Sequence, residues 1–319
     1  MGTGRGSTDV ANDEPSAFHF VTVDGTRLRY LDRGHGTPVL LLHGNGSTIE
    51  DFVSSGIMDD AETGYRFIAF DRPGFGLSER PRGRAWTPSE QARLLLRALV
   101  HLEIERPIVI GHSWGALVAL AMALESAEAV AGLVLLSGYY YPTRRAVTMG
   151  APAAFGFGNI LRHVVAPAVR RLMAGATVSN VFAPCMVPER FKRTFPMSLA
   201  MQPSHMRAVD EEAAMLFDAA SALCTAYSKL VVPLRIIAGS DDRIVDTDLH
   251  SARLHEDVGT STFQRVPGCG HMVHHAAPAD VLAAVASVGL ARAREQANAA
   301  LTTSPPRKWL HIGERPAAA

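Results

Sequence analysis

The 319-residue sequence has few cysteines, balanced charges and no long apolar run. Lys and Arg together number 31, as do Asp and Glu, so the formal net charge is zero. A neutral chain lacks the electrostatic attraction that draws basic proteins to nucleic acid or to anionic membranes. No apolar run reaches the roughly 18 residues that a membrane-spanning helix needs. We therefore expect no nucleic-acid partner and no integral membrane segment.

The three cysteines, Cys185, Cys224 and Cys269, are widely spaced. This spacing argues against a disulfide framework and favours a reducing compartment. Residues 1–17 are rich in Gly, Ser, Asp and Asn and lack the apolar core of a signal peptide. We expect these residues to form a disordered arm and the protein to be cytoplasmic. The sequence predicts no oligomeric state.

Buried strands and amphipathic helices alternate over much of the chain, which predicts a parallel sheet with helices on both faces. Asp24-Gly25 predicts a hairpin turn near the start. Thr87-Pro88-Ser89-Glu90 predicts a helix start with a capping box. The apolar runs that predict buried strands lie at residues 38–42, 65–70, 108–110, 130–136, 234–239 and 262–266.

The alternation breaks after Ser137 and resumes near residue 229. We expect a core formed by residues 18–137 and 229–297, a helical insertion at 138–228, and a tail at 298–319 that contains Trp309. The insertion is rich in Phe and Met. Most of these side chains are explained by a small core within the insertion, and the others would line an adaptable apolar pocket.

The most informative motif is Gly111-His112-Ser113-Trp114-Gly115, which lies between an apolar strand and a helix of small apolar residues. A G-x-S-x-G sequence in this setting is typical of a nucleophile elbow, where a tight turn exposes a serine hydroxyl. Glycine two residues before and after the serine avoids clashes with neighbouring backbone. Ser113 is therefore the candidate nucleophile.

Two later loops offer the groups that would activate this serine. Asp241 and Asp242 follow one apolar strand, and His271 follows the next in a Gly-rich loop. The ends of parallel strands meet at one edge of a sheet, where ligands and reactive groups gather. The order Ser, Asp, His is the one that a serine nucleophile of this type requires. Either aspartate could supply the carboxylate.

Over roughly residues 20–290 the chain resembles the α/β-hydrolase superfamily. The motifs that carry the resemblance are the elbow, His43-Gly44-Asn45-Gly46, Asp71-Arg72-Pro73-Gly74-Phe75-Gly76-Leu77-Ser78, Gly239-Ser240-Asp241-Asp242-Arg243-Ile244-Val245 and Gly270-His271. The resemblance implies a mostly parallel eight-stranded sheet with helices on both faces and a helical cap at 138–228. It assigns the acid to Asp242, and the oxyanion hole to the backbone N–H groups of Asn45 and Trp114.

Other polar residues near these motifs have structural interpretations. His43 and His112 would fix loop backbone, Asp71 would accept bonds from backbone donors, and Asp246 would cap a helix. His274 and His275 follow His271 closely, but no Cys, Asp or Glu lies at zinc-like spacing around them. We expect neither a metal nor a cofactor.

The predicted function is that of a serine hydrolase with a Ser113-His271-Asp242 triad, acting on a small to medium, largely apolar carboxylic ester or related acyl compound. Three alternatives are a carbon–carbon bond hydrolase of the meta-cleavage type, a cofactor-free perhydrolase or haloperoxidase, and a non-catalytic small-molecule receptor. Asn45 and Trp114 also resemble the halide-binding pair of haloalkane dehalogenases. Those enzymes attack with aspartate, however, and a serine would form an ether that water does not readily cleave.

Overall fold

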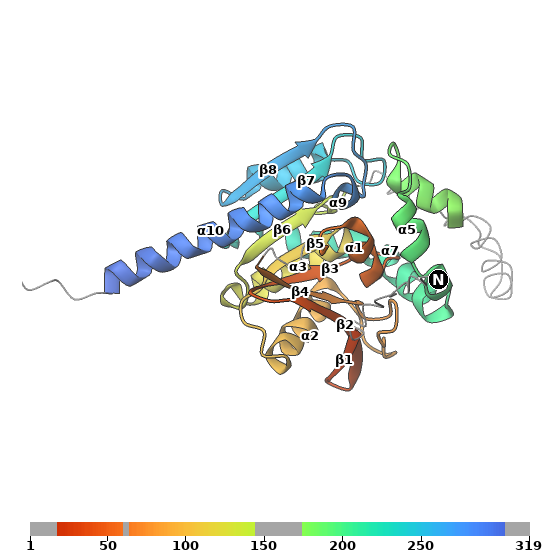
Figure 1. The fold of residues 1–319 in the computed structure, drawn as a ribbon, viewed down its shortest axis with the longest axis horizontal. Helices are drawn as coiled ribbons and strands as arrows, with labels where there is room; N and C mark the ends of the chain where they lie inside the picture. The colour runs from red at the N-terminus through yellow and green to blue at the C-terminus, as the bar shows by residue number, and fades with distance from the viewer. Residues whose placement is uncertain (1–17, 60–63, 144–173, 304–319) are drawn as a thin grey trace, which may run out of the picture.

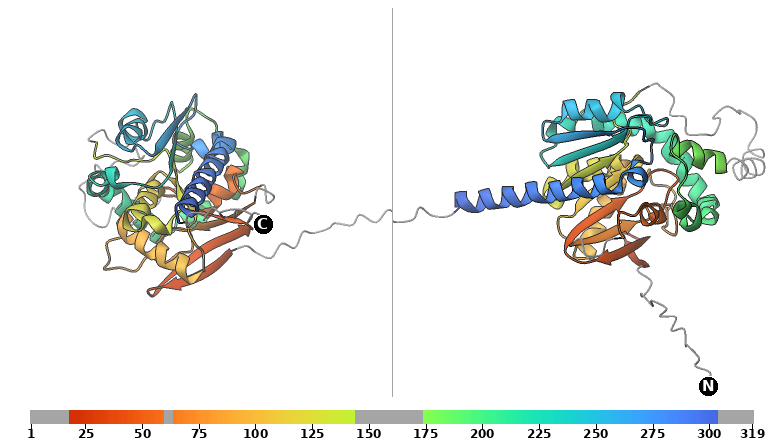
Figure 2. Two further views of the ribbon diagram at one scale, coloured as in Figure 1. Left: turned by 90° about the vertical axis from the view of Figure 1, so that its left-hand side faces the viewer. Right: turned by 45° about the horizontal axis from the view of Figure 1, so that its top comes forward.

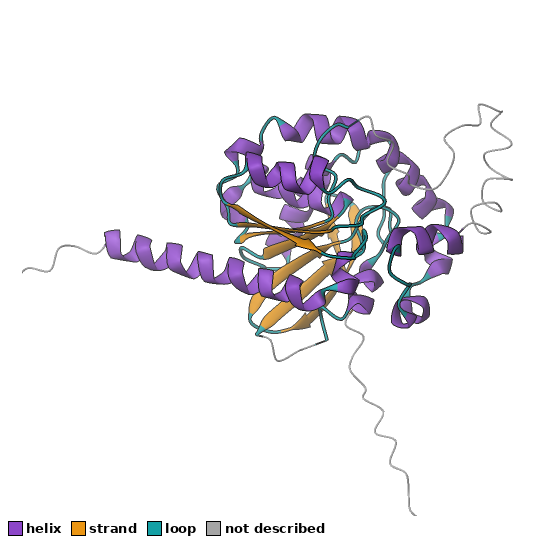
Figure 3. Ribbon diagram, turned by 90° about the horizontal axis from the view of Figure 1, so that it is seen from above, coloured by secondary structure: helices purple, strands orange, loops and turns teal. Residues whose placement is uncertain are grey.

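A computed structural model describes residues 18–59, 64–143 and 174–303 of the chain. The described residues form an eight-stranded sheet in the order β1-β2-β4-β3-β5-β6-β7-β8, with helices on both faces (Figures 1 and 3). The predicted fold class is confirmed. The expected N-terminal arm at 1–17 and Trp309 lie outside the described residues.

The strands follow the apolar runs. Those from β3 onward pair with one another in parallel, whereas β2 pairs with β4 antiparallel. β1 and β2 form the predicted antiparallel hairpin, in which Asp24 and Gly25 take positive φ values of 48° and 71°. The strands are β1 Phe18–Val23, β2 Thr26–Gly34, β3 Thr37–Leu42, β4 Tyr65–Phe70, β5 Ile108–His112, β6 Gly132–Leu136, β7 Leu234–Gly239 and β8 Ser261–Val266.

Two apolar clusters fill the spaces between the sheet and the helices. One includes residues of α2 (Pro88–His101) and α3 (Trp114–Glu125). The other includes residues of α1 (Ile49–Ser55), α9 (Val273–Ala276) and α10 (Pro278–Thr303). The shorter elements are η1 Ala127–Ala129, η2 Tyr227–Lys229, η3 Asp248–Ala252 and α8 Arg253–Asp257.

The start of α2 departs from the predicted capping box. The Thr87 hydroxyl accepts a hydrogen bond from the Glu90 backbone N–H at 3.2 Å, as expected. The Glu90 carboxylate instead pairs with the guanidinium groups of Arg84 and Arg93. Two nearby cations compete for this carboxylate, so the cap is formed by threonine alone.

Between β6 and β7 the described chain contains helices joined by loops and has no strand. Residues 174–182 are followed by α5 Glu189–Thr194, α6 Met197–Ala200 and α7 Pro203–Cys224. We call residues 174–224 the inserted helices; Phe155, Phe157 and Met173 of the expected insertion lie outside the described residues. α5 packs against α1 and α7 against α3.

The last described helix, α10, continues past the boundary expected at residue 297 and ends at Thr303 (Figure 2). Its C-terminal part projects from the body of the molecule. The rest of the expected tail, 304–319, is outside the described residues. Among the helices that the structure describes, none has the length and apolarity required to cross a bilayer.

Candidate active site

Ser113 lies at a sharp turn between β5 and α3. Its φ and ψ are 52° and −115°, a conformation that is strained for a residue with a side chain. The flanking glycines make this turn possible: a Cβ at Gly111 would overlap the backbone of Gly115 and Ala116, and one at Gly115 would overlap the Leu42 carbonyl. The side chain of Ser113 thus stands at the end of β5, where the residue is partly exposed.

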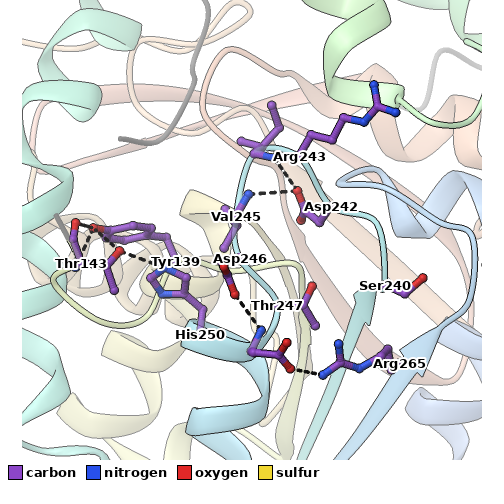
Figure 4. A pocket seen from close by; sticks show the side chains of 12 residues that line it. Tyr139, Thr143, Ser240, Asp242, Arg243, Val245, Asp246, Thr247, His250 and Arg265 are labelled. Atoms are coloured by element: carbon purple, nitrogen blue, oxygen red, sulfur yellow. Dashed lines mark hydrogen bonds and ion pairs between the residues drawn. The ribbon is translucent and has the colours of Figure 1, made fainter. Parts of the chain in front are cut away.

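The loops after β7 and β8 bring an acid and a histidine together. His271 Nδ1 lies 2.8 Å from Asp242 Oδ2, and the two side chains are 5% and 1% exposed. The second oxygen of Asp242 accepts hydrogen bonds from the backbone N–H groups of Ile244 and Val245, at 2.8 and 2.9 Å (Figure 4). Asp242 is therefore fixed at both oxygens.

Asp241 has a different environment, although it is the next residue. It is exposed, and its carboxylate accepts a hydrogen bond from the Ser240 hydroxyl at 3.0 Å. Its backbone N–H donates to the Cys269 carbonyl at 2.9 Å, which joins the acid loop to the histidine loop. The structure therefore pairs His271 with Asp242 and leaves Asp241 in solvent.

The serine turn and the histidine loop are also in contact. His112 Nε2 lies 3.1 Å from the His271 carbonyl oxygen, and the centroids of the two rings are 4.9 Å apart. In the described part of the chain, the Ser113 hydroxyl makes no hydrogen bond of ordinary length to the His271 ring. Such bonds are often long in a free enzyme and tighten when substrate binds.

The loop after β3 lies against the serine. A Cβ placed on Gly44 would be 3.1 Å from the Ser113 Cβ, so this loop approaches the nucleophile as closely as glycine allows. The side-chain amide of Asn45, the next residue, donates to the Val209 carbonyl of α7 at 3.2 Å. Trp114 is 2% exposed, and its side chain packs in the core.

Arg72 connects this loop to the inserted helices. Its guanidinium donates to the carbonyls of His43 and Gly44 at 2.7 and 3.0 Å. It also forms a two-point ion pair with Glu212 of α7, at 2.5 and 3.0 Å. The Arg72 and Glu212 side chains are both 0% exposed.

The residues with predicted structural roles make the expected contacts. His43 Nε2 accepts from the Arg72 backbone N–H at 3.0 Å, and burial holds the pKa of His43 well below its usual range. Asp71 accepts from the backbone N–H groups of Ile49 and Leu77. Asp246 accepts from the first two N–H groups of η3.

The fold also brings Asp51 to His274 and His275. Asp51 Oδ1 lies 3.2 and 2.7 Å from their Nε2 atoms, and the three ligand atoms lie within 4.8 Å of one another, as a metal site would require. Burial opposes ionisation of Asp51, but the two imidazoles hold its pKa well below the usual range. Burial also lowers the pKa of His274.

Hydrogen bonding accounts for this cluster without an ion. A metal at the two Nε2 atoms would move the ring protons to Nδ1, and neither Nδ1 has a partner among the described residues. Metal-bound histidines nearly always donate from the second nitrogen. We therefore interpret Asp51 as a hydrogen-bonded support for the segment that follows His271.

A hollow of about 380 Å³ lies beside the acid loop (Figure 4). Asp242 lines it, but Ser113 and His271 do not. The other lining residues are mainly polar: Tyr139, Thr143, Ser240, Arg243, Ile244, Val245, Asp246, Thr247, Asp248, His250 and Arg265. This hollow therefore adjoins the candidate site without containing its nucleophile.

Sequence reasoning missed Arg72, Glu212 and Asp51. Arg72 and Glu212 are separated by 140 residues, and Asp51 and His274 by 223. One signal could have identified Glu212, because it shares helical spacing with the buried His205 and Ala208 on α7. A carboxylate on such a face requires a buried partner.

Comparison with known proteins agrees with the fold. A family model described as "alpha/beta hydrolase fold" matches residues 37–278. Haloalkane dehalogenase 2 of Mycobacterium tuberculosis is 37% identical over 116 residues, which are 36% of this chain and 40% of that protein. The chain thus matches about two fifths of the length of this relative.

Other similarities extend over more of the chain. The 2-hydroxymuconate semialdehyde hydrolase of Pseudomonas putida is 26% identical over 84% of this chain and 93% of its own length. The crystal structure of a putative lipase from Acinetobacter baumannii superposes with a TM-score of 0.68 at 17% identity, covering 87% of this chain and 92% of the other.

Proposed function

Since the chain belongs to the alpha/beta hydrolase fold family, we propose that it is a serine hydrolase with Ser113, His271 and Asp242 as its catalytic triad. The observation that carries this proposal is the 2.8 Å contact between His271 Nδ1 and the buried Asp242 carboxylate, in a loop adjoining the Ser113 turn. An acid–imidazole pair beside a strained, partly exposed serine is the arrangement that activates a hydroxyl nucleophile.

The mechanism follows from these positions. The Ser113 hydroxyl attacks the acyl carbon while His271 Nε2 accepts its proton and then returns it to the leaving alcohol. Asp242 holds the Nδ1–H tautomer and stabilises the imidazolium. Water then attacks the acyl-enzyme with the same assistance and releases the acid. Because an acyl-serine can be hydrolysed and an alkyl-serine ether cannot readily be, acyl transfer suits this nucleophile.

The developing oxyanion would be bound by backbone N–H groups of Trp114 and Asn45. Trp114 begins α3, and N–H groups in the first turn of a helix have no partner within it. Gly44 lies against Ser113, which brings the Asn45 backbone to the same side of the turn. Loss of one such donor raises a barrier of this kind by on the order of 3 kcal/mol.

We assign the inserted helices to a cap over the site, within an insertion at 138–228. Support comes from the contacts of α7 with Asn45 and Arg72, next to the nucleophile. A cap at this position would exclude water and shape the substrate pocket. The three cysteines are free thiols, which supports a cytoplasmic location.

The substrate class that fits best is a small to medium, largely apolar carboxylic ester. Dehalogenation, the activity that names one relative, is not proposed because the nucleophile is serine. A second candidate is hydrolysis of a carbon–carbon bond, favoured by the similarity to the 2-hydroxymuconate semialdehyde hydrolase over most of both chains. The same triad can serve both reactions.

An activity screen tests the proposal. The purified protein should hydrolyse members of a p-nitrophenyl ester series from acetate to decanoate, and Ser113→Ala should abolish the activity. Turnover of a ring-cleavage dienoate with no turnover of any ester would select the carbon–carbon hydrolase instead. Ester turnover retained in Ser113→Ala would contradict the assigned nucleophile.

A further inference from the structure

A second hollow, of about 390 Å³, lies between the loop after β4 and helix α7. It is lined by residues 80–86 on one side and by residues of α7 from Arg207 to Met215 on the other. None of the three proposed triad residues lines it. Nothing in the proposed reaction uses this hollow.

The charged lining is mostly cationic. Arg80, Arg82, Arg84 and Arg207 contribute four guanidinium groups, whereas Glu211 contributes one carboxylate. Just outside the lining, Glu90 pairs with Arg84, and Glu212, which pairs with Arg72, lies 3.9 Å from Arg80. An excess of positive charge at a partly enclosed surface attracts an anion. Guanidinium is also the side-chain group that best matches the two oxygens of a carboxylate.

Arg80 has a buried donor without a partner. Its side chain is 1% exposed; Nε donates to Glu211 Oε2 at 2.7 Å, and Nη1 donates to the Pro73 carbonyl at 3.0 Å. Nη2 has no hydrogen-bond partner among the described residues. Leaving a buried donor of a charged group unsatisfied is unfavourable, so an incoming acceptor would be stabilised here.

Arg207 offers a second donor of the same kind. Its Nε lies 3.5 Å from Glu211 Oε1 but makes no hydrogen bond in the described structure. Its Nη2 donates to the Arg80 carbonyl at 3.0 Å, which holds the two arginines side by side. Two residues of the lining thus each have one N–H group without a hydrogen-bond partner in the described structure, Arg80 Nη2 and Arg207 Nε.

The rest of the lining is apolar. The Trp86 ring is 1% exposed and lies 4.7 Å from the Arg84 guanidinium carbon. Ala85, Ala214 and Met215 complete this side. We propose that the hollow binds a small monocarboxylate with an apolar body, whose head pairs with Arg80 and Arg207 and whose body packs on Trp86 and Met215.

A ligand bound in this hollow would also be connected to the candidate active site through a chain of contacts. Arg80 Nη1 is 3.9 Å from Glu212 Oε1, and Glu212 pairs with Arg72, which donates to the Gly44 carbonyl. The binding proposal itself does not depend on the proposed function. Only this coupling does, so we test binding directly.

The experiment is calorimetric titration of the full-length protein with octanoate. We expect one octanoate to bind per chain in this hollow. Binding should be at least tenfold weaker in Ala214→Trp, because the larger side chain fills the hollow from the exposed side of α7. Binding should be weakened to the same extent in Arg207→Gln. Arg253→Gln, an exposed arginine of α8 outside the lining, is the control and should bind as the wild type does.

Octanamide has the same apolar body as octanoate but no negative charge, so it tests the head group. Inorganic phosphate is charged but has no apolar body, so it tests the contribution of that body. Both should bind at least tenfold more weakly than octanoate. Octanoate affinity that is unchanged in Ala214→Trp, with an unchanged circular dichroism melt, would overturn the proposal because it would place binding elsewhere. Equal affinity for octanamide or phosphate would also overturn it, as would the absence of octanoate binding at millimolar concentration.

Discussion

Two adjacent aspartates show how one residue step changes the chemistry of a carboxylate. Asp242 is buried, accepts two backbone N–H groups and pairs with His271, whereas Asp241 is exposed beside Ser240. The loop turns between them, so that only Asp242 faces the histidine. A shift of one residue along this loop therefore decides which carboxylate can fix the imidazole tautomer.

Asp242→Asn should keep the fold and lower kcat by on the order of 10³–10⁴-fold, because an amide no longer fixes the tautomer or stabilises the imidazolium. Asp241→Asn is the matched control and should change kcat less than twofold. Steady-state kinetics on the best ester would check both. The opposite ranking of the two variants would reassign the acid to Asp241.

His250 makes stability depend on pH. Its Nδ1 faces the backbone N–H groups of Tyr140 and Tyr141 at 3.1 and 3.3 Å, which only an unprotonated nitrogen can accept. Burial lowers the pKa of His250 to about 4, although Asp246 and Asp242 oppose the shift and Arg253 adds to it. The unfolded chain therefore binds a proton between about pH 6.5 and pH 4 that the native state does not.

The resulting stabilisation is fully present above the unfolded pKa and is lost as the pH falls toward 4, by up to about 3 kcal/mol. His250→Asn keeps a side-chain acceptor but cannot titrate, so its free energy of unfolding should fall less steeply between pH 7 and pH 4. Urea titrations at several pH values would measure the two slopes. Equal slopes in the variant and the wild type would refute the role of His250.

At the scale of elements, a buried ion pair joins α7 to the loop after β4, where Arg72 also donates to two carbonyls of the loop after β3. Arg72 and Glu212 are both fully buried, and Gln91 donates a further hydrogen bond to Glu212 at 2.9 Å. Such a pair adds little net stability compared with apolar residues, but removing one partner leaves an uncompensated charge. We therefore expect Glu212 to help fix α7 against the loops that follow β3 and β4.

Glu212→Gln should destabilise the protein by about 3–5 kcal/mol, because Arg72 keeps its charge in a buried environment. Asp218→Asn, at an exposed acidic position of the same helix, should cost about 1 kcal/mol or less. Urea unfolding of both variants would measure the difference. Similar values for the two would show that the buried pair does not hold α7 in place.

Much of the element pattern was predictable because it depends on local sequence. Apolar runs gave the parallel strands, and Asp24-Gly25 gave the hairpin. The Glu90 part of the capping box was not predictable, since Arg84 and Arg93 compete for the carboxylate only once the loop and the helix turn bring them within reach. Local propensity sets where an element begins, and tertiary contacts decide how its side chains pair.

At the scale of the whole molecule, the parallel sheet brings the candidate site together. Ser113, Asp242 and His271 follow β5, β7 and β8, and the order of these elements along the chain was enough to predict their convergence. The Arg72–Glu212 and Asp51–His275 contacts could not be predicted this way, because each joins distant segments that carry no shared motif. The candidate reactive groups could thus be named from the sequence, whereas the residues that support them could not.

The most direct test of the central claim is the intact mass of the protein after exposure to a small fluorophosphonate. An activated Ser113 should be labelled once per chain, with loss of fluoride, and Ser113→Ala should remain unlabelled. Absence of labelling on well-folded wild-type protein, or labelling that persists in Ser113→Ala, would contradict a serine hydrolase built on this triad.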